Sequence, residues 1–169
     1  VFDEIILDAV TRGGVDTVVN LAAGLDARPW RLPLPPALRW VDVDLPGILA
    51  YKAERVGDAP PACRYEAVAA DLTDAAARDA TLASIGAGAR SALVVSEGLL
   101  IYLTAEQVGA LAASLHAVPS FRRWLFDLAN PLLMKFMQKT WGRAASAGNA
   151  PFRFAPAEGP EFFRRYGWR

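Results

Sequence analysis

The chain has 169 residues, 53% of them hydrophobic, and it carries 18 basic and 18 acidic side chains. This length favours one domain whose core needs no covalent staple, and the single cysteine and single histidine exclude a disulfide scaffold and Cys-rich or His-rich metal sites. No apolar run reaches the ~20 residues of a membrane span, and the first residues lack the basic stretch of a signal peptide. We therefore expect a cytoplasmic domain with no metal and no membrane partner.

The balanced charge hides an uneven distribution along the chain. Residues 1–120 carry 15 acidic and nine basic side chains, whereas residues 121–169 carry nine basic and three acidic ones. A basic segment of this kind can be a tail that binds nucleic acid. That alternative has to be weighed against the motifs of the acidic part.

Short apolar runs that are typical of strands alternate with segments of helical periodicity. Strands are expected at residues 17–22, 39–44, 65–70, 91–96 and 124–128. Helices are expected at residues 2–11, 46–56, from 73 or 74 to 84, from 104 to 116, and 131–142. This alternation predicts an α/β fold, a parallel sheet with helices on both faces. Ligands of such sheets bind beyond the carboxyl ends of the strands.

Acidic residues follow each of the first four expected strands. They are Asp26, Asp44, Asp71 and Glu97. A single acidic residue in a turn is common, because turns favour aspartate. Four of them along one edge of a parallel sheet favour a shared ligand site over solvated surface.

The turn after the first expected strand, residues 22–27, places Gly24 among small side chains that let the backbone approach a ligand closely. It matches a degenerate dinucleotide fingerprint in which alanines replace the outer glycines. Asp44 lies 20 residues beyond Gly24, where an acidic side chain binds ribose hydroxyls. This spacing fits NAD and S-adenosylmethionine alike. Asp44 could also cap the helix that begins at Pro46.

Four motifs, in a fixed order, carry a resemblance to a known family. Residues 19–28 read V-N-L-A-A-G-L-D-A-R, residues 41–46 read V-D-V-D-L-P with a lysine at 52, residues 70–74 read A-D-L-T-D, and residues 96–104 read S-E-G-L-L-I-Y-L-T. Together they resemble the leucine carboxyl methyltransferase-like family. These are class I S-adenosylmethionine-dependent methyltransferases, and they include bacterial polyketide O-methyltransferases of the tetracenomycin type.

The resemblance covers residues 2–130 and implies a Rossmann-like sheet of seven strands whose last two form an antiparallel edge. Five parallel strands can be placed here, so we expect the final antiparallel strands to be missing and the single domain to be cut at both ends. Residues 1–120 would then be the cofactor-binding half. Residues 121–169 would supply the fifth strand and a cover on the acceptor side, which explains the basic segment without nucleic acid.

The resemblance also implies S-adenosylmethionine contacts at seven positions, which are Ala22, Gly24, Asp44, Leu45, Asp71, Leu72 and Glu97. The Gly24 turn would lie against the methionine part, and Asp44 would accept hydrogen bonds from the ribose hydroxyls. Asp71 and the amide of Leu72 would hold the adenine. Glu97 would face the methionine ammonium. The ribose hydroxyls, the adenine amine and the methionine ammonium would all donate hydrogen bonds, and an ionised carboxylate can only accept them.

The sequence departs from the family pattern at three points. Ala22 replaces the first glycine of the turn, and Asp42 replaces a glutamate. The family arginine that pairs with the cofactor carboxylate would lie upstream of residue 1. Arg28 is a candidate substitute, although a structural salt bridge with Asp26 or a neighbouring helix explains it at least as well.

No general base stands out, so the catalytic residues stay unknown. A carboxylate acceptor needs no base, whereas a hydroxyl would benefit from one. Tyr102 could line an acceptor pocket and His116 ends a helix, but each has a plain structural interpretation. We expect O-methylation of a carboxylate or hydroxyl on a small molecule such as a polyketide.

Three other functions remain open. An NAD-dependent oxidoreductase would share the glycine turn, but two of the three glycines and a Tyr-x-x-x-Lys pair are absent. A nucleic-acid methyltransferase of the adenine-amino type would need an Asn/Asp-Pro-Pro-aromatic motif where residues 96–99 read S-E-G-L. A non-catalytic methyltransferase-like remnant or interaction module is the third.

Overall fold

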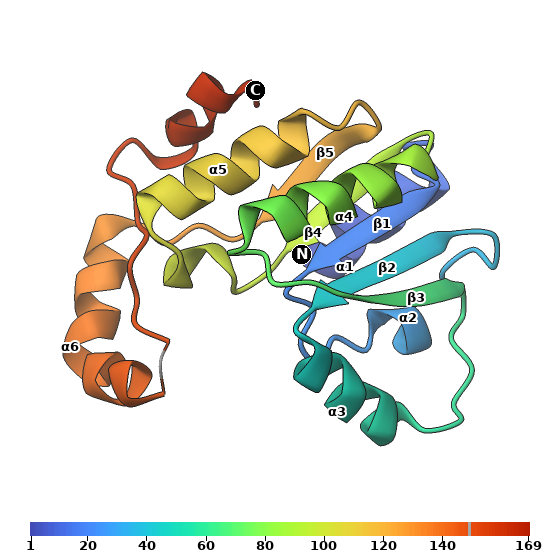
Figure 1. The fold of residues 1–169 in the computed structure, drawn as a ribbon, viewed down its shortest axis with the longest axis horizontal. Helices are drawn as coiled ribbons and strands as arrows, with labels where there is room; N and C mark the ends of the chain where they lie inside the picture. Colours follow the sequence, from blue (N-terminus) through green and yellow to red (C-terminus); the bar gives the residue numbers. More distant parts are fainter. Residues whose placement is uncertain (149) are drawn as a thin grey trace. The chain divides into compact units, whose positions relative to one another are not determined.

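The structure, a computed structural model, describes residues 1–148 and 150–169. It contains one five-stranded sheet in the order β3-β2-β1-β4-β5 (Figure 1). The strands are β1 Thr17–Leu21, β2 Arg39–Asp44, β3 Arg64–Ala69, β4 Ala92–Ser96 and β5 Phe121–Phe126. The β1–β2, β1–β4 and β2–β3 ladders are all parallel. The predicted α/β class is therefore confirmed.

The helices expected from periodicity are all present. They are α1 Phe2–Thr11, α3 Pro46–Val56, α4 Ala75–Ala87, α5 Ala105–His116 and α6 Pro131–Ala147. Asp74 caps α4 by accepting from the Ala77 amide, and Thr104 forms a complete capping box with Gln107 at the start of α5. Three short elements were not expected, namely α2 Arg28–Arg31, η1 Leu100–Tyr102 and η2 Gly159–Tyr166.

The fifth strand lies earlier in the chain than expected. It begins at the buried Phe121 and ends at Phe126, whereas the apolar run had suggested residues 124–128. The exposed pair Arg122 and Arg123 concealed the first half of the strand. Asp127 lies beyond the strand, and its side chain accepts a hydrogen bond of 2.6 Å from the Gly98 amide.

The chain divides into two compact units. The first comprises Val1–Glu97 and Val118–Leu125, and the second comprises Gly98–Ala117 and Phe126–Arg169. The expected division of roles between residues 1–120 and 121–169 stays a prediction. None of the helices in residues 1–148 and 150–169 has the length and hydropathy of a bilayer-spanning segment.

The core of the first unit explains why β1 and β4 read as nearly continuous apolar runs. Every residue of these two strands is buried, as is typical of parallel strands covered on both faces. In Figure 1, α4 lies in front of the sheet and α1 behind it. One core cluster joins α1 to alternate strand positions; its members include Ile6, Ala9, Val18, Trp40, Leu93 and Val95.

The second unit is held together largely by aromatic side chains. Phe154, Phe162 and Phe163 are buried and meet edge-on, with ring centroids 5.0 and 5.3 Å apart for the Phe154–Phe162 and Phe162–Phe163 pairs. Tyr166 in η2 packs where Gly109 of α5 has no side chain, so a β-carbon there would collide with the tyrosine hydroxyl. Much of the aromatic C-terminal part therefore serves as core.

Candidate functional site

The strand register brings the acidic residues at the carboxyl ends of β1, β2 and β4 to one edge of the sheet. Leu21 of β1 pairs with Val43 of β2, and Asn20 pairs with Val95 of β4. Continuing the β1–β2 ladder by one residue places Ala22 beside Asp44, and continuing the β1–β4 ladder by two residues places Ala22 beside Glu97. This edge is also where the chain, having built β2 and β3 on one side of β1, crosses to β4 on the other, which is the usual ligand position in such sheets.

Asp44 closes the turn that follows β1. Its Oδ2 accepts a hydrogen bond of 2.7 Å from the Gly24 amide, and its Oδ1 accepts one of 2.7 Å from the Leu45 amide. The spacing of 20 residues between Gly24 and Asp44 thus corresponds to a direct contact. Asp44 does not cap α3, whose N-cap is Leu45 and has no side-chain cap hydrogen bond.

The turn needs a left-handed backbone at two positions. Gly24 has a φ of 52°, which glycine adopts freely. Ala22 has a φ of 51° and is the one non-glycine residue with positive φ among residues 1–148 and 150–169. Alanine in this conformation is strained by about 1–3 kcal/mol, and such strain is typically found at functional sites. Glycine would therefore fit position 22 with less strain than alanine.

Asp71 and Leu72 follow β3 at the outer end of the same edge. Oδ1 of Asp71 accepts from both the amide and the hydroxyl of Thr73, at 2.8 and 2.7 Å. These two bonds lower the pKa of the Asp71 carboxyl, so the group is ionised at neutral pH. The carbonyl of Leu72 accepts a long hydrogen bond, 3.4 Å, from the buried Arg78 of α4.

Glu97 comes directly after β4 and is bound to Arg28. Oε2 of Glu97 lies 2.5 Å from Nη2 of Arg28, while the glutamate side chain is 49% exposed. Arg28 is also paired with Asp26 and with Asp3 of α1. The structural salt bridge considered for Arg28 is therefore present.

A buried polar cluster lies beneath this edge. Asp42, whose side chain has no exposed surface, accepts hydrogen bonds from Lys52 of α3 and from the hydroxyl of Tyr65 at 2.8 Å. Its other oxygen accepts from Trp40 at 2.9 Å and Asn20 at 3.1 Å. The burial of Tyr65 and the charge of Asp42 raise the pKa of the tyrosine hydroxyl, which therefore stays a donor.

One side-chain amide connects the buried cluster to the rim, our name for the acidic residues Asp26, Asp44, Asp71 and Glu97 at the carboxyl edge of the sheet. Nδ2 of Asn20 donates to Asp42 and also to Oδ2 of Asp26, at 3.1 and 3.0 Å. Sequence reasoning did not assign a role to Asn20 or Lys52 and treated Asp42 only as a departure from the family pattern. The sequence did contain a signal, because Asn20 and Asp42 are polar residues within strands that a parallel sheet buries. Buried polar groups need hydrogen-bonding partners, so both positions indicated a buried cluster.

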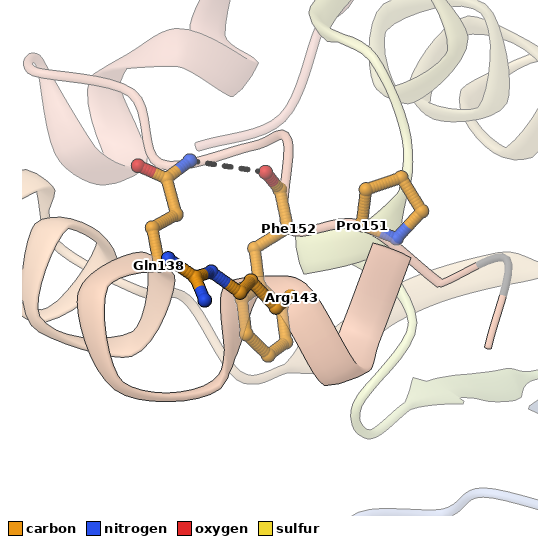
Figure 2. Close-up of a pocket in the computed structure, with 5 residues that line it drawn as sticks. Gln138, Arg143, Pro151 and Phe152 are labelled. Carbon is orange, nitrogen blue, oxygen red and sulfur yellow. Dashed lines mark hydrogen bonds between the residues drawn. The ribbon is translucent and has the colours of Figure 1, made fainter. Parts of the chain in front are cut away.

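The second unit contains an open pocket of about 550 Å³, lined by Gln138, Gly142, Arg143, Pro151 and Phe152. Figure 2 shows the Gln138 amide, which donates a hydrogen bond of 3.1 Å to the Phe152 carbonyl, together with the Arg143 guanidinium. Tyr102 contacts the same Phe152, with ring centroids 5.8 Å apart. His116 instead packs edge-on against Trp168, which agrees with a structural role.

No metal site accompanies these groups in the described parts of the chain, where no three His, Cys, Asp or Glu side chains are arranged to hold an ion. The polar groups at this edge are carboxylates and backbone amides. Such a donor and acceptor set suits an organic ligand with several hydroxyl and amino groups.

Comparison with known proteins identifies the family. The family model described as leucine carboxyl methyltransferase matches residues 1–116. The chain belongs to the leucine carboxyl methyltransferase family. This match includes the four sequence motifs and every residue of the rim and the buried cluster described above.

Curated relatives agree with this assignment. A protein of Parafrankia sp. (strain EAN1pec) named "Putative S-adenosyl-L-methionine-dependent methyltransferase Franean1_4929" is 42% identical over 115 residues, covering 65% of this chain and 36% of its own. A protein of the same descriptive name from Mycobacterium sp. (strain KMS) is 35% identical over 175 residues, covering 95% of this chain and 56% of its own. The chain thus spans about a third to a half of these relatives.

Solved structures share the fold of this leucine carboxyl methyltransferase family member. A DUF574 family protein from Streptomyces avermitilis superposes with a TM-score of 0.72 at 18% identity, covering 95% of this chain and 64% of its own. An O-methyltransferase family protein from Burkholderia thailandensis superposes with a TM-score of 0.63 at 16% identity, covering 99% and 51%. At these identities the likeness is one of fold.

Proposed function

We propose that the protein binds S-adenosylmethionine at the carboxyl edge of its sheet and transfers the methyl group to an oxygen of a small molecule. The observation that carries this proposal is the contact between Asp44 and the Gly24 amide, with Glu97 after the neighbouring strand β4. This arrangement presents a narrow turn between two carboxylates. It fits a ligand that has a ribose near one carboxylate and a cationic amino group near the other.

The chemistry of the rim fits the polar groups of that cofactor. The ribose hydroxyls, the adenine amine and the methionine ammonium are donors, and ionised carboxylates are pure acceptors. Asp44 would hold the ribose while keeping its bond to Gly24, since each carboxylate oxygen can accept more than one hydrogen bond. Asp71 would hold the adenine amine, with Leu72 beside it, and Glu97 would hold the ammonium. Ala22, Gly24 and Leu45 would contribute backbone and apolar contacts.

The reaction asks little acid–base chemistry of the protein. When bound, S-adenosylmethionine supplies a methyl group activated by a positive sulfur. The protein has to hold the acceptor oxygen in line with that group and exclude water, which provides much of the rate enhancement. A carboxylate acceptor is already ionised at neutral pH and needs no base. We therefore infer that the acceptor is a carboxylate or an acidic hydroxyl, and assign no catalytic base.

The class of acceptor is inferred from the second unit and from the relatives. Its pocket combines an aromatic ring, Phe152, with one cation, Arg143, which suits an anionic organic molecule. Fold likeness to a protein named as an O-methyltransferase family member supports an oxygen as the methyl acceptor. A polyketide acid or phenol is a ligand of this kind, and we propose that small-molecule class in preference to nucleic acid.

A binding experiment separates the proposed function from its alternatives. Calorimetry of the purified protein should show heat with S-adenosylhomocysteine and none with NAD. Binding of NAD in preference would support an oxidoreductase, and binding of neither would support a non-catalytic module. Transfer of a radioactive methyl group to carboxylic acids and phenols then tests turnover. Steeply salt-dependent binding to RNA or DNA would instead favour a nucleic-acid substrate.

A further inference from the structure

Arg28 joins three carboxylates that come from three different parts of the chain. Its Nε donates to Asp3 of α1 at 2.8 Å, its Nη1 to Asp26 of the β1 turn at 2.8 Å, and its Nη2 to Glu97 after β4 at 2.5 Å. The arginine side chain is only 9% exposed. Each nitrogen of the guanidinium is thus used on a different partner.

The three carboxylates are not equivalent. Asp26 is fixed from several sides, because it also accepts from the Arg28 amide at 2.9 Å and from Asn20 at 3.0 Å. Asp3 is fixed by a second arginine, Arg31, at 2.6 and 3.0 Å. Arg28 is the one group in residues 1–148 and 150–169 that binds the Glu97 side chain. The guanidinium is therefore held on two sides and holds Glu97 on the third.

This asymmetry matters because Glu97 is half exposed. A free glutamate on the rim would sample several rotamers, and binding a ligand would have to restrict it at a cost in entropy. The charge-assisted bond to Arg28 fixes one oxygen and leaves the other available as an acceptor. The charges of Asp3, Asp26 and Glu97 exceed those of Arg28 and Arg31, so the cluster keeps one net negative charge that favours a cation.

We propose that Arg28 is a positioning residue that holds Glu97 in the orientation that accepts the ammonium group of the cofactor. This inference rests on the proposed function. It also assigns Arg28 a different role from direct pairing with the cofactor carboxylate, because the buried guanidinium is already surrounded by three carboxylates of the protein. Lysine could not replace it, since an ammonium lacks the planar fork that reaches three directions at once.

Two ligands distinguish this role from a general effect on folding. S-adenosylhomocysteine carries the amino-acid group that Glu97 would bind, whereas 5′-methylthioadenosine has the same adenine, ribose and thioether but lacks that group. Affinities are measured by calorimetry for the wild type, Arg28→Met and Arg28→Lys. We expect both variants to bind S-adenosylhomocysteine at least about tenfold more weakly, because the charge-assisted hydrogen bond between Glu97 and the ammonium group is lost. Both should bind 5′-methylthioadenosine with an affinity within about twofold of the wild-type value.

Arg31→Met is the matched control, because Arg31 also binds Asp3 but does not touch Glu97. It should leave both affinities within about twofold. In a double-mutant cycle with Glu97→Gln, Arg28→Met should add little to the loss caused by Glu97→Gln alone. If Arg28→Met does not fold, as judged by thermal unfolding, Arg28→Lys carries the same comparison.

The possible results separate the two proposals. Equal weakening of both ligands, an unchanged affinity for S-adenosylhomocysteine, or full additivity with Glu97→Gln would each overturn the positioning role while leaving the proposed function intact. A wild-type protein that binds neither ligand would overturn the proposed function itself.

Discussion

The amide of Gly24 donates to Oδ2 of Asp44 across 2.7 Å, and this bond ties the turn after β1 to the last residue of β2. The same carboxylate binds the Leu45 amide through its other oxygen. Asp44 therefore has a structural task and a proposed ligand task at once. Its substitution should affect binding more than folding, because the site lies at a partly exposed edge.

Replacing Asp44 tests the ribose assignment. Asp44→Ala should weaken binding of S-adenosylhomocysteine by about 1–3 kcal/mol through the loss of charged hydrogen bonds. Asp44→Asn is the matched control, because it keeps one acceptor oxygen and should lose less. Calorimetry measures both affinities, and an unchanged affinity in Asp44→Ala would contradict the assignment.

Lys52 tests the buried cluster. Lys52→Met removes the cation from an ion pair whose side chains are 3% and 0% exposed, which leaves the Asp42 carboxylate uncompensated. The free energy of unfolding should fall by about 3–5 kcal/mol, measured by urea denaturation. Arg90→Met, which breaks the exposed Arg90–Asp16 pair, is the control and should change stability little. Equal effects of the two substitutions would rule out a special role for the buried pair.

Ala22 tests the strain in the turn. Ala22→Gly should raise the free energy of unfolding by about 1 kcal/mol, because glycine adopts a φ of 51° without a steric penalty. Ala23→Gly is the neighbouring control: its φ is not positive, so glycine there should only destabilise. Thermal unfolding of the two variants gives the sign directly, and a destabilised Ala22→Gly would argue against stored strain.

The stability should depend on pH through Asp3. Arg31 and then Arg28 lower the pKa of this carboxyl to about 2. A group whose pKa is lowered in the folded state stabilises that state above its unfolded pKa. The contribution of Asp3 should therefore be complete above about pH 5 and be lost as the pH falls towards 2.

Asp3→Asn provides the comparison for this pH dependence. The difference in free energy of unfolding between wild type and Asp3→Asn should shrink as the pH falls from about 5 to 2.5. Asp16, Glu66 and Asp71, whose pKa values are also lowered, keep their own contributions in both proteins. A difference that stays constant over this range would show that the arginine contacts of Asp3 do not stabilise the fold.

Cys63 provides a reporter of unfolding. Burial, and then the charge of Asp42, raise the pKa of its thiol to about 11, so little thiolate exists near neutral pH. Ellman's reagent should therefore react slowly with the native protein and rapidly in urea, since the thiolate is the nucleophile. The labelling rate should rise along the same denaturation curve as circular dichroism. Fast labelling of the native protein would contradict the burial of Cys63.

Much of the fold follows from local pattern. The bounds of α1, β2 and α3 agree with those expected from apolar periodicity. Each helix buries residues on one face, and most of the strand is buried. The spacing between Gly24 and Asp44 indicated that both lie at the ligand-binding edge, but it did not predict the hydrogen bond between them. The fifth strand was misplaced because its first half carries two exposed arginines.

The contacts of Arg28 and Lys52 could not be predicted in the same way. Arg28 meets Asp3 and Glu97, which are 25 and 69 residues away, only because α1 and β4 converge on the β1 turn. Lys52 reaches Asp42 of β2 only because α3 packs against β3, the strand beside β2. Such partnerships depend on how elements pack, and no spacing rule along the chain encodes them.

The amide of Asn20 has consequences for how this sequence can change over time. Its two hydrogens serve Asp26 at the rim and Asp42 in the core, and Asp42 in turn requires Lys52. Replacing any one of these four side chains removes a hydrogen bond or an ion pair from at least one of the others. We therefore expect homologous sequences either to keep all four residues or to change them together. The buried Asp42–Lys52 pair would then limit which residues are accepted at position 26 at the edge of the sheet.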